Sequence, residues 1–262
     1  MSASTTSCCY RPPSSLVQVV ESARDLGVIL DSRLTPSANV AALCRSGYYQ
    51  LRQLRPLVQS MTVEAARTAA VAFISRRLDY FNSLLYGLPH ILLRKLQSVQ
   101  NATARLITGT QSSDRISPVL RELRWLPIRQ RVKFKVACLV RQSLSGQTPL
   151  YLADDCRLVS DSTRRSLRSA DVSTCVVPRT LSSYGDRTFA ASGPRLWNSF
   201  SVQLRNLDIT YGLFRRQLKG YLFRKVRWLL ICCVIEKHLL TYLRERCYQQ
   251  QVAYAAVNRA SD

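Results

Sequence analysis

Apolar side chains recur in steps of three and four between residues 71 and 88. They are Val71, Ile74, Leu78, Phe81, Leu85 and Leu88. This spacing places them on one face of an α-helix, because a helix completes a turn every 3.6 residues. Thr62 can cap the start of such a helix, and Pro89 cannot continue it. We therefore predict one helix between Thr62 and Pro89 that must bury this face against other helices.

Apolar periodicity and capping residues predict further helices before and after this one. With 47% hydrophobic residues among 262, the chain has enough apolar side chains for a sizeable core. Residues 35–156 are therefore expected to form a helical bundle. Its other helices are predicted from Thr35-Pro36 to about Arg55 before Pro56, through Leu92, Leu96, Val99, Ala102 and Leu106 to Gly109, from Ser117-Pro118, and from Ile128 to Leu144 before Gly146.

The segments on either side of the bundle have a different composition. Residues 1–15 are rich in Ser, Thr and Pro and are expected to be disordered. Within residues 16–34, the runs Leu16–Val20 and Leu26–Leu30 predict two strands. Two strands alone are marginally stable in water, so we interpret them as the remnant of a larger sheet.

Periodicity fades after residue 156. Residues 157–224 are predicted to be an irregular basic extension with a short strand at Cys175–Val177, turns or short helices between Tyr184 and Trp197, and a helix capped by Asp208 that runs to Phe223. Residues 225–262 are weakly helical and form a tail of unknown origin. The predicted fold class is mainly α: a helical bundle after a remnant β-hairpin, followed by this irregular region.

The charge balance is the strongest indication of a partner. Lys and Arg number 38 against 16 acidic residues, which gives a net charge of +22. Such an excess increases self-repulsion in the compact state and favours a polyanionic partner. RNA, DNA or an RNA–DNA hybrid fits best, because Arg dominates the basic residues and pairs bidentately with phosphate. An anionic membrane surface, or charge that serves solubility alone, is the alternative.

Basic residues are concentrated on predicted helix faces. Arg94, Ser98, Asn101 and Arg105 form a polar stripe opposite the apolar face of their helix. Solvated helix faces usually mix charges of both signs, whereas these faces carry few acids. The candidate nucleic-acid-binding residues are Arg76, Arg77, Arg94, Lys95, Arg105, Arg129, Arg131, Lys133, Lys135, Arg164, Arg165, Arg215 and Lys219.

No pattern in the chain predicts a catalytic site, a metal site or a cofactor. The segment Tyr151–Asp155 (YLADD) resembles the Tyr-x-Asp-Asp turn of two-metal polymerases, but one extra residue precedes the acids and the preceding Thr148-Pro149 predicts a helix start. Cys232, Cys233, His238 and Cys247 are spaced poorly for zinc.

The cysteines and the apolar runs bear on the compartment. Nine irregularly spaced cysteines indicate reduced thiols of an intracellular protein, in the nucleus or the cytoplasm. We find neither a signal peptide nor a membrane span, since the longest apolar run, Trp228–Ile235, is far too short to cross a bilayer.

A chain of motifs resembles one known family. In order, the motifs are Leu26–Asp31 (LGVILD), Arg77–Pro89 (RLDYFNSLLYGLP), Leu96–Ile107 (LQSVQNATARLI), Leu123–Arg129 (LRWLPIR), Val177–Thr180 (VPRT), Tyr184–Ala190 (YGDRTFA) and Gly193–Asn198 (GPRLWN). As a set they are similar to the region after the catalytic core in reverse transcriptases of non-LTR retrotransposons of the jockey/CR1-like, LINE type. The resemblance covers about residues 20–224.

The resemblance implies a fold and a function. Residues 26–31 would be the last strand of the palm, and residues 35–145 would be the helical thumb and its extension. In this family the thumb grips the template–primer backbone. The fingers and most of the palm, with the catalytic aspartates, would lie before residue 1. The Tyr151–Asp155 segment would have no catalytic role.

The expected product is a polymerase fragment that is not itself an enzyme and binds RNA or DNA, with the missing polymerase domains of the parent element as a further possible partner. Two alternatives remain open. One is the non-functional product of a decayed reading frame, and the other is a small metal-dependent polymerase or nuclease that uses Asp154 and Asp155.

Overall fold

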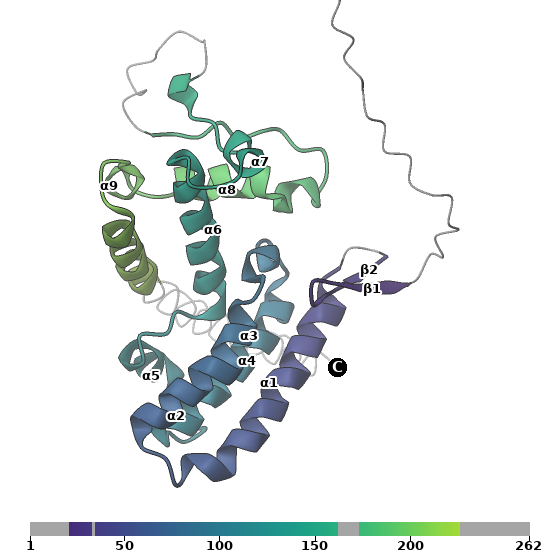
Figure 1. The fold of residues 1–262 in the computed structure, drawn as a ribbon, viewed down its shortest axis with the longest axis vertical. Coiled ribbons are helices and arrows are strands. Elements are labelled where there is room, and N and C mark those ends of the chain that lie inside the picture. The colour runs from purple at the N-terminus through teal and green to yellow at the C-terminus, as the bar shows by residue number, and fades with distance from the viewer. Residues whose placement is uncertain (1–20, 33–34, 162–172, 226–262) are drawn as a thin grey trace, which may run out of the picture.

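A computed structural model describes residues 21–32, 35–161 and 173–225, and these residues are mainly helical with one small β-hairpin. The helices α1 to α5 form one part of the molecule, and α7 to α9 lie at the opposite end, beyond the long helix α6 (Figure 1). The predictions for residues 1–20, for Arg164 and Arg165, and for the tail beyond residue 225 lie outside the described residues.

The hairpin consists of β1 (Ser22–Asp25) and β2 (Val28–Asp31), paired antiparallel with Asp25 opposite Val28. Leu26 and Gly27, both with positive φ, form the tight two-residue turn. The second predicted strand is confirmed. The first strand begins two residues after Val20, beyond the Leu16 to Val20 run, and all four of its residues are exposed, so no apolar pattern marks it.

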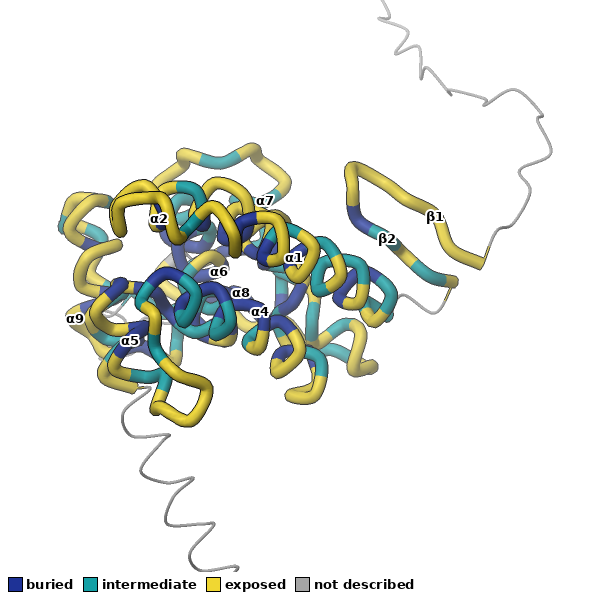
Figure 2. Tube along the Cα trace, turned by 90° about the horizontal axis from the view of Figure 1, so that it is seen from below, coloured by how far each residue is buried: buried dark blue, intermediate teal, exposed yellow. Residues whose placement is uncertain are grey.

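The hairpin is attached to the helices by few contacts. The Tyr80 hydroxyl donates to the Leu26 carbonyl at 2.8 Å, and the Ile29 amide donates to Asn39 Oδ1 at 3.4 Å. Figure 2 shows both strands at the edge of the helical body, largely exposed.

Helix α1 (Ser37–Val58) packs lengthwise against α4 (His90–Thr108), as Figure 1 shows. The expected end of α1 before Pro56 is wrong, because the helix includes Pro56 and continues to Val58. Pro56 has no amide hydrogen to donate to the Arg52 carbonyl, so the helix loses one hydrogen bond there and ends two residues later. The predicted end of α4 is confirmed, since Gly109 takes the left-handed conformation (φ 67°) after its last residue.

The long helix predicted between Thr62 and Pro89 is confirmed as far as Asp79 and is wrong beyond it. Thr62 does cap α2 (Val63–Ala70), accepting from the Ala65 amide at 3.3 Å. The helix continues through a π-helical turn, η1 (Val71–Ser75), and α3 (Arg76–Asp79), and then the chain reverses at Phe81, whose φ is 50°.

After this reversal a 3-10 turn, η2 (Asn82–Leu85), leads into α4. Because the chain folds back, Leu85 and Leu88 still reach the core although they are not on the same helix as Ile74. Val71 and Phe81 remain more than one third exposed.

Helices α5 (Ile116–Glu122) and α6 (Ile128–Leu144) begin close to where they were predicted. The buried face of α4 was placed about one residue away from its true position, because Leu93, Gln100 and Thr103 are buried whereas Leu92 is only half-buried. Gln100 can be buried because its side-chain amide donates to the Leu126 carbonyl at 2.9 Å.

Beyond α6 lie α7 (Leu150–Asp154), the 3-10 turns η3 (Val159–Asp161) and η4 (Gly185–Arg187), α8 (Phe189–Asn198), α9 (Val202–Arg205) and a helix at residues 211–225, which Figure 1 draws yellow-green below α9. Cys175 forms only an isolated bridge with Leu158 instead of a strand. Thr210 and not Asp208 caps the 211–225 helix, since its backbone carbonyl accepts from the Phe214 amide at 2.9 Å and its hydroxyl accepts from the Leu213 amide at 3.4 Å.

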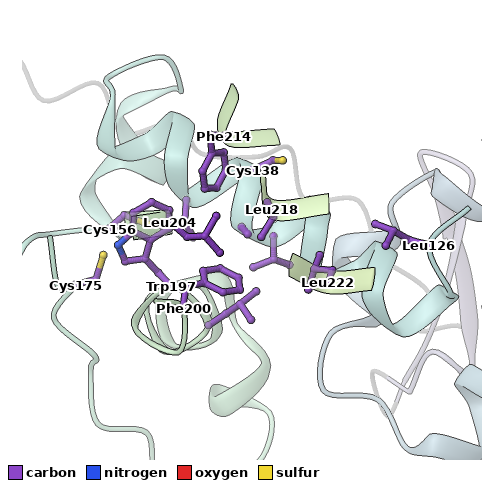
Figure 3. Packing of buried hydrophobic residues seen from close by; sticks show 14 residues of the cluster. Leu126, Cys138, Cys156, Cys175, Trp197, Phe200, Leu204, Phe214, Leu218 and Leu222 are labelled. Carbon is purple, nitrogen blue, oxygen red and sulfur yellow. The ribbon is translucent and has the colours of Figure 1, made fainter. Parts of the chain in front are cut away.

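Helix α6 joins two of the hydrophobic cores. Its first turns contribute Ile128 and Val132 to the core shared with α1 and α4. Its later turns contribute to a second core with α8 and the 211–225 helix, in which Trp197 and Phe214 are fully buried with ring centroids 5.9 Å apart (Figure 3). A third cluster lies among α2, α4 and α5.

None of the helices within the described residues has an apolar stretch long enough to span a bilayer.

Candidate nucleic-acid interface

A basic cleft of about 520 Å³ lies where the two parts of the molecule meet. Its walls are α6, the 211–225 helix, the turn between α5 and α6, and the chain reversal after α3. Among the described residues that line it, Asp79 is the single acid. The cations that line it are Arg124, Arg131, Lys135, Arg215, Arg216 and Lys219.

The 211–225 helix presents its cations to the cleft because of how it packs. Phe214, Leu218 and Leu222 recur every four residues and are almost completely buried. Burying this stripe fixes the rotation of the helix, so that Arg215 and Lys219, each one position further along, form a second stripe beside it.

Arg141 holds the start of this helix against α6. Its side chain is 6% exposed and donates from Nη2 to the carbonyls of Leu207 at 2.7 Å and Ile209 at 2.8 Å. These residues directly precede the helix, so Arg141 is a structural arginine that sets the position of one wall of the cleft.

Arg131 is also used mainly inside the fold. Its Nε donates to the Leu126 carbonyl at 3.0 Å, its Nη1 pairs with Asp79 Oδ1 at 3.0 Å, and its guanidinium lies 5.9 Å from the Trp125 ring centroid. The side chain is only 12% exposed. Arg131 therefore ties the α5–α6 turn to α3 and neutralises the one carboxylate of the cleft.

Arg124 lies in the turn that ends α5. The Trp125 amide donates to the Leu120 carbonyl at 2.7 Å and the Arg124 amide donates to the Arg121 carbonyl at 2.9 Å, which is the hydrogen-bond pattern of a Schellman motif. Arg124 occupies the left-handed position of this motif with φ 54°, where glycine is usual. An exposed cation is thus placed at the cleft by a backbone conformation that is unfavourable for arginine.

The remaining cations repel one another. Burial lowers the pKa of Lys219, and the neighbouring charges of Arg131, Arg124, Arg215 and Arg67 lower it further. Arg215 finds no carboxylate in the lining beyond Asp79 and instead lies over the rings of Tyr211 at 5.7 Å and Phe134 at 6.0 Å. The cleft therefore has a positive charge that its own acids do not balance.

The structure brings together four of the predicted residues, which are Arg131, Lys135, Arg215 and Lys219. Sequence reasoning missed Arg124 and Arg216. Arg124 lies inside the LRWLPIR motif, but only its left-handed backbone reveals its position. Arg216 follows Arg215 directly. The buried stripe of Phe214, Leu218 and Leu222 could have indicated that both arginines lie on the exposed side of this helix.

Other candidates lie elsewhere. Arg129 and Lys133 line a smaller pocket of about 200 Å³ beside Tyr86 and Leu88. Burial lowers the pKa of Lys133, and the charges of Arg129 and Lys225 add to this effect. This second basic site is on α6 but separate from the cleft.

The remaining candidates are not gathered into a site. Arg94 and Lys95 are exposed on α4, and Arg77 donates to the Ser46 hydroxyl at 2.7 Å. Arg76 borders a shallow hollow with Arg67. Arg105 donates to the carbonyls of Gln111, Ser112 and Asp114 and so closes the loop after α4.

Asp154 and Asp155 lie at the end of α7 and not in a turn between strands. Within the part of the chain that the structure describes, no three His, Cys, Asp or Glu residues are grouped to hold a metal ion. Cys156 and Cys175 are buried thiols, and burial raises their pKa values to about 11 and about 12.

Comparison with known protein families, with curated proteins and with solved structures gave no match. The resemblance to reverse transcriptases therefore depends on the sequence motifs alone.

Proposed function

We propose that the chain is the post-palm, thumb-like part of a non-LTR retrotransposon reverse transcriptase, that it binds the backbone of RNA or DNA, and that it is not itself an enzyme. The basic cleft carries this proposal. Six cations from three separate segments converge there around one acid that is already paired with Arg131. Phosphate is the group that such a surface recognises, because each neutralised phosphate releases condensed counterions.

The internal hydrogen bonds favour a working protein over the product of a decayed reading frame. Gln100 and Arg141 are buried polar residues that donate from Nε2 and from Nη2, respectively, to specific backbone carbonyls far along the chain. Such pairs stabilise one arrangement of the helices, because misplacing them would leave buried polar groups unpaired. In this proposal the hairpin is the end of the palm sheet, and the polymerase domains of the parent element are a second partner.

The test is a salt series with the purified chain and a labelled RNA–DNA hybrid, with template-directed nucleotide incorporation followed in the same samples. The proposal predicts binding that weakens steeply with salt, as expected of phosphate contacts, and no incorporation. Absence of binding at low salt would contradict the backbone-binding function and leave the decayed product as the better account.

Incorporation would contradict the proposal in a different way. If it were lost in the double variant D154N/D155N, the metal-dependent polymerase or nuclease would replace the binding fragment as the best account. Asp154 and Asp155 lie at the end of α7 and line none of the walls of the cleft. The same double variant should therefore bind the hybrid as the unmodified chain does.

A further inference from the structure

The basic cleft differs from a flat surface that follows a nucleic-acid backbone. It is a concave space of about 520 Å³, within the range of pockets that hold small ligands. A space of this size can enclose a single terminal nucleotide, whereas a duplex can only lie across its opening with its backbone against the cations at the rim. Its cations also come from three separate segments of the chain and line the same cleft.

Charge at this density suits a group that carries more than one negative charge. An internal phosphodiester carries a single charge, whereas a terminal phosphate monoester carries nearly two at neutral pH. The charges of Arg131, Arg124 and Arg215 act together on Lys219, so a dianion placed among them would interact with several cations at once.

The backbone at Arg124 is a second observation. Glycine would adopt the left-handed conformation at the end of α5 without the steric cost that arginine meets there. The chain nevertheless places a guanidinium at this position, at the rim of the cleft. Residues held in unfavourable backbone conformations are concentrated at ligand sites, where the position of the side chain offsets the strain.

Asn82 adds an acceptor to the lining. The residue is 4% exposed, its side-chain amide donates to Asp79 Oδ1 at 3.3 Å, and its own Oδ1 has no partner among the described residues. A buried acceptor needs a donor, and a phosphate oxygen is not one. A sugar hydroxyl or a base amino group of the bound nucleotide is a suitable donor.

We propose that this cleft binds the 5′-phosphorylated end of a nucleic-acid strand, with Arg124, Arg215 and Lys219 around the terminal phosphate and Asn82 accepting a hydrogen bond from the terminal nucleoside. The inference rests on the proposed function and narrows it, because the end of the strand is bound in addition to its backbone.

The test uses the full chain and a short single-stranded RNA, labelled at its 3′ end, with a 5′-phosphate or a 5′-hydroxyl on the same sequence. Fluorescence anisotropy at one salt concentration should show about tenfold tighter binding of the phosphorylated strand, the value of one additional charge-assisted hydrogen bond. The preference should disappear in R124G and R215Q and persist in R45Q, which removes an exposed arginine of α1.

R124G is an informative variant because it should not unfold the protein. Glycine relieves the backbone at the end of α5, so the variant should melt at the same or a higher temperature while losing the end preference. Loss of both folding and preference would contradict this assignment of Arg124.

Competition distinguishes a strand end from a free oligophosphate. A nucleoside 5′-triphosphate should displace the phosphorylated RNA better than inorganic tripolyphosphate does, because only the former offers donors to Asn82. Equal or better displacement by tripolyphosphate would overturn the role of Asn82 in recognising a nucleoside.

The two proposals fail in different ways. If both strands bind equally well, the end-binding inference is wrong and backbone binding stands. If neither strand binds, the proposed function fails as well.

Discussion

Replacing Gly47 with alanine should destabilise the protein although Gly47 lies inside a helix. A methyl group there would lie 2.6 Å from Val99 Cγ1 across the α1–α4 contact, whereas carbon atoms in contact normally lie about 3.5–4.0 Å apart. Val99 is completely buried, and a valine in a helix has one strongly preferred rotamer, so it cannot turn aside. The two helices must therefore separate.

The expected size follows from two opposing effects. Forcing an extra methyl into a packed core costs about 1–3 kcal/mol, and alanine gains up to about 1 kcal/mol over glycine in a helix. We expect Gly47→Ala to lower the free energy of unfolding by about 1–2 kcal/mol in urea denaturation. Gly220→Ala is the matched control, because no atom lies within 4 Å of the added methyl and the substitution should stabilise by up to about 1 kcal/mol.

A second substitution, at Val99, tests whether the contact between the two helices is the cause. In a chain that already carries Val99→Ala, the clashing methyl is gone and Gly47→Ala should become neutral or stabilising. If Gly47→Ala destabilises equally in both backgrounds, the close approach of α1 and α4 at this point is not the cause.

Three further predictions concern the second core. Arg141→Met should lower the unfolding free energy by about 2–3 kcal/mol, because two carbonyls lose charged donors; an unchanged urea midpoint would contradict this. Trp197→Phe should cost about 2 kcal/mol in the same assay, since the indole N–H donates to the Ser173 carbonyl at 2.8 Å. Burial raises the pKa values of Cys156 and Cys175 to about 11 and about 12, so their contribution to stability is complete below about pH 9 and falls as the pH rises from there to about 12. The variant C156A/C175A under reducing conditions should show a shallower loss between pH 8 and pH 11, and an unchanged loss would contradict the assignment.

Local signals in the sequence predicted where several helices begin and end. Thr62 accepts from a backbone amide as an N-cap should, and Gly109 takes the left-handed conformation after α4. These predictions succeed because a cap is decided by residues next to it in sequence. α6 was predicted from Ile128 to Leu144, and these are its observed bounds.

The errors arise where distant contacts decide the structure. The periodicity of residues 71–88 cannot reveal that the chain reverses at Phe81. Leu85 and Leu88 would be buried if the helix continued, and they are also buried in the observed fold, in which the chain turns back. Tertiary packing also rotates α4 so that Gln100 faces inward, where the Leu126 carbonyl satisfies it.

The candidate site was predictable only in part. Residues four apart on one helix, such as Arg215 and Lys219, can be paired from sequence spacing. That they face Arg124 depends on how the 211–225 helix docks on α6, which no local pattern encodes. The difference between a cleft arginine and a structural one, such as Arg141, is likewise visible only from its hydrogen bonds.

Two charge-removal variants, compared in their binding to an RNA–DNA hybrid across a salt series, distinguish binding in the cleft from binding by overall charge. R215Q/K219Q removes two cations from the cleft, and R45Q/R52Q removes two exposed cations from α1. If the cleft binds the nucleic acid, the cleft variant should bind more weakly and its slope of log affinity against log salt should fall by about 2, whereas the control should stay close to the unmodified chain. Equal losses in both variants would show that overall charge, and not the cleft, binds the nucleic acid.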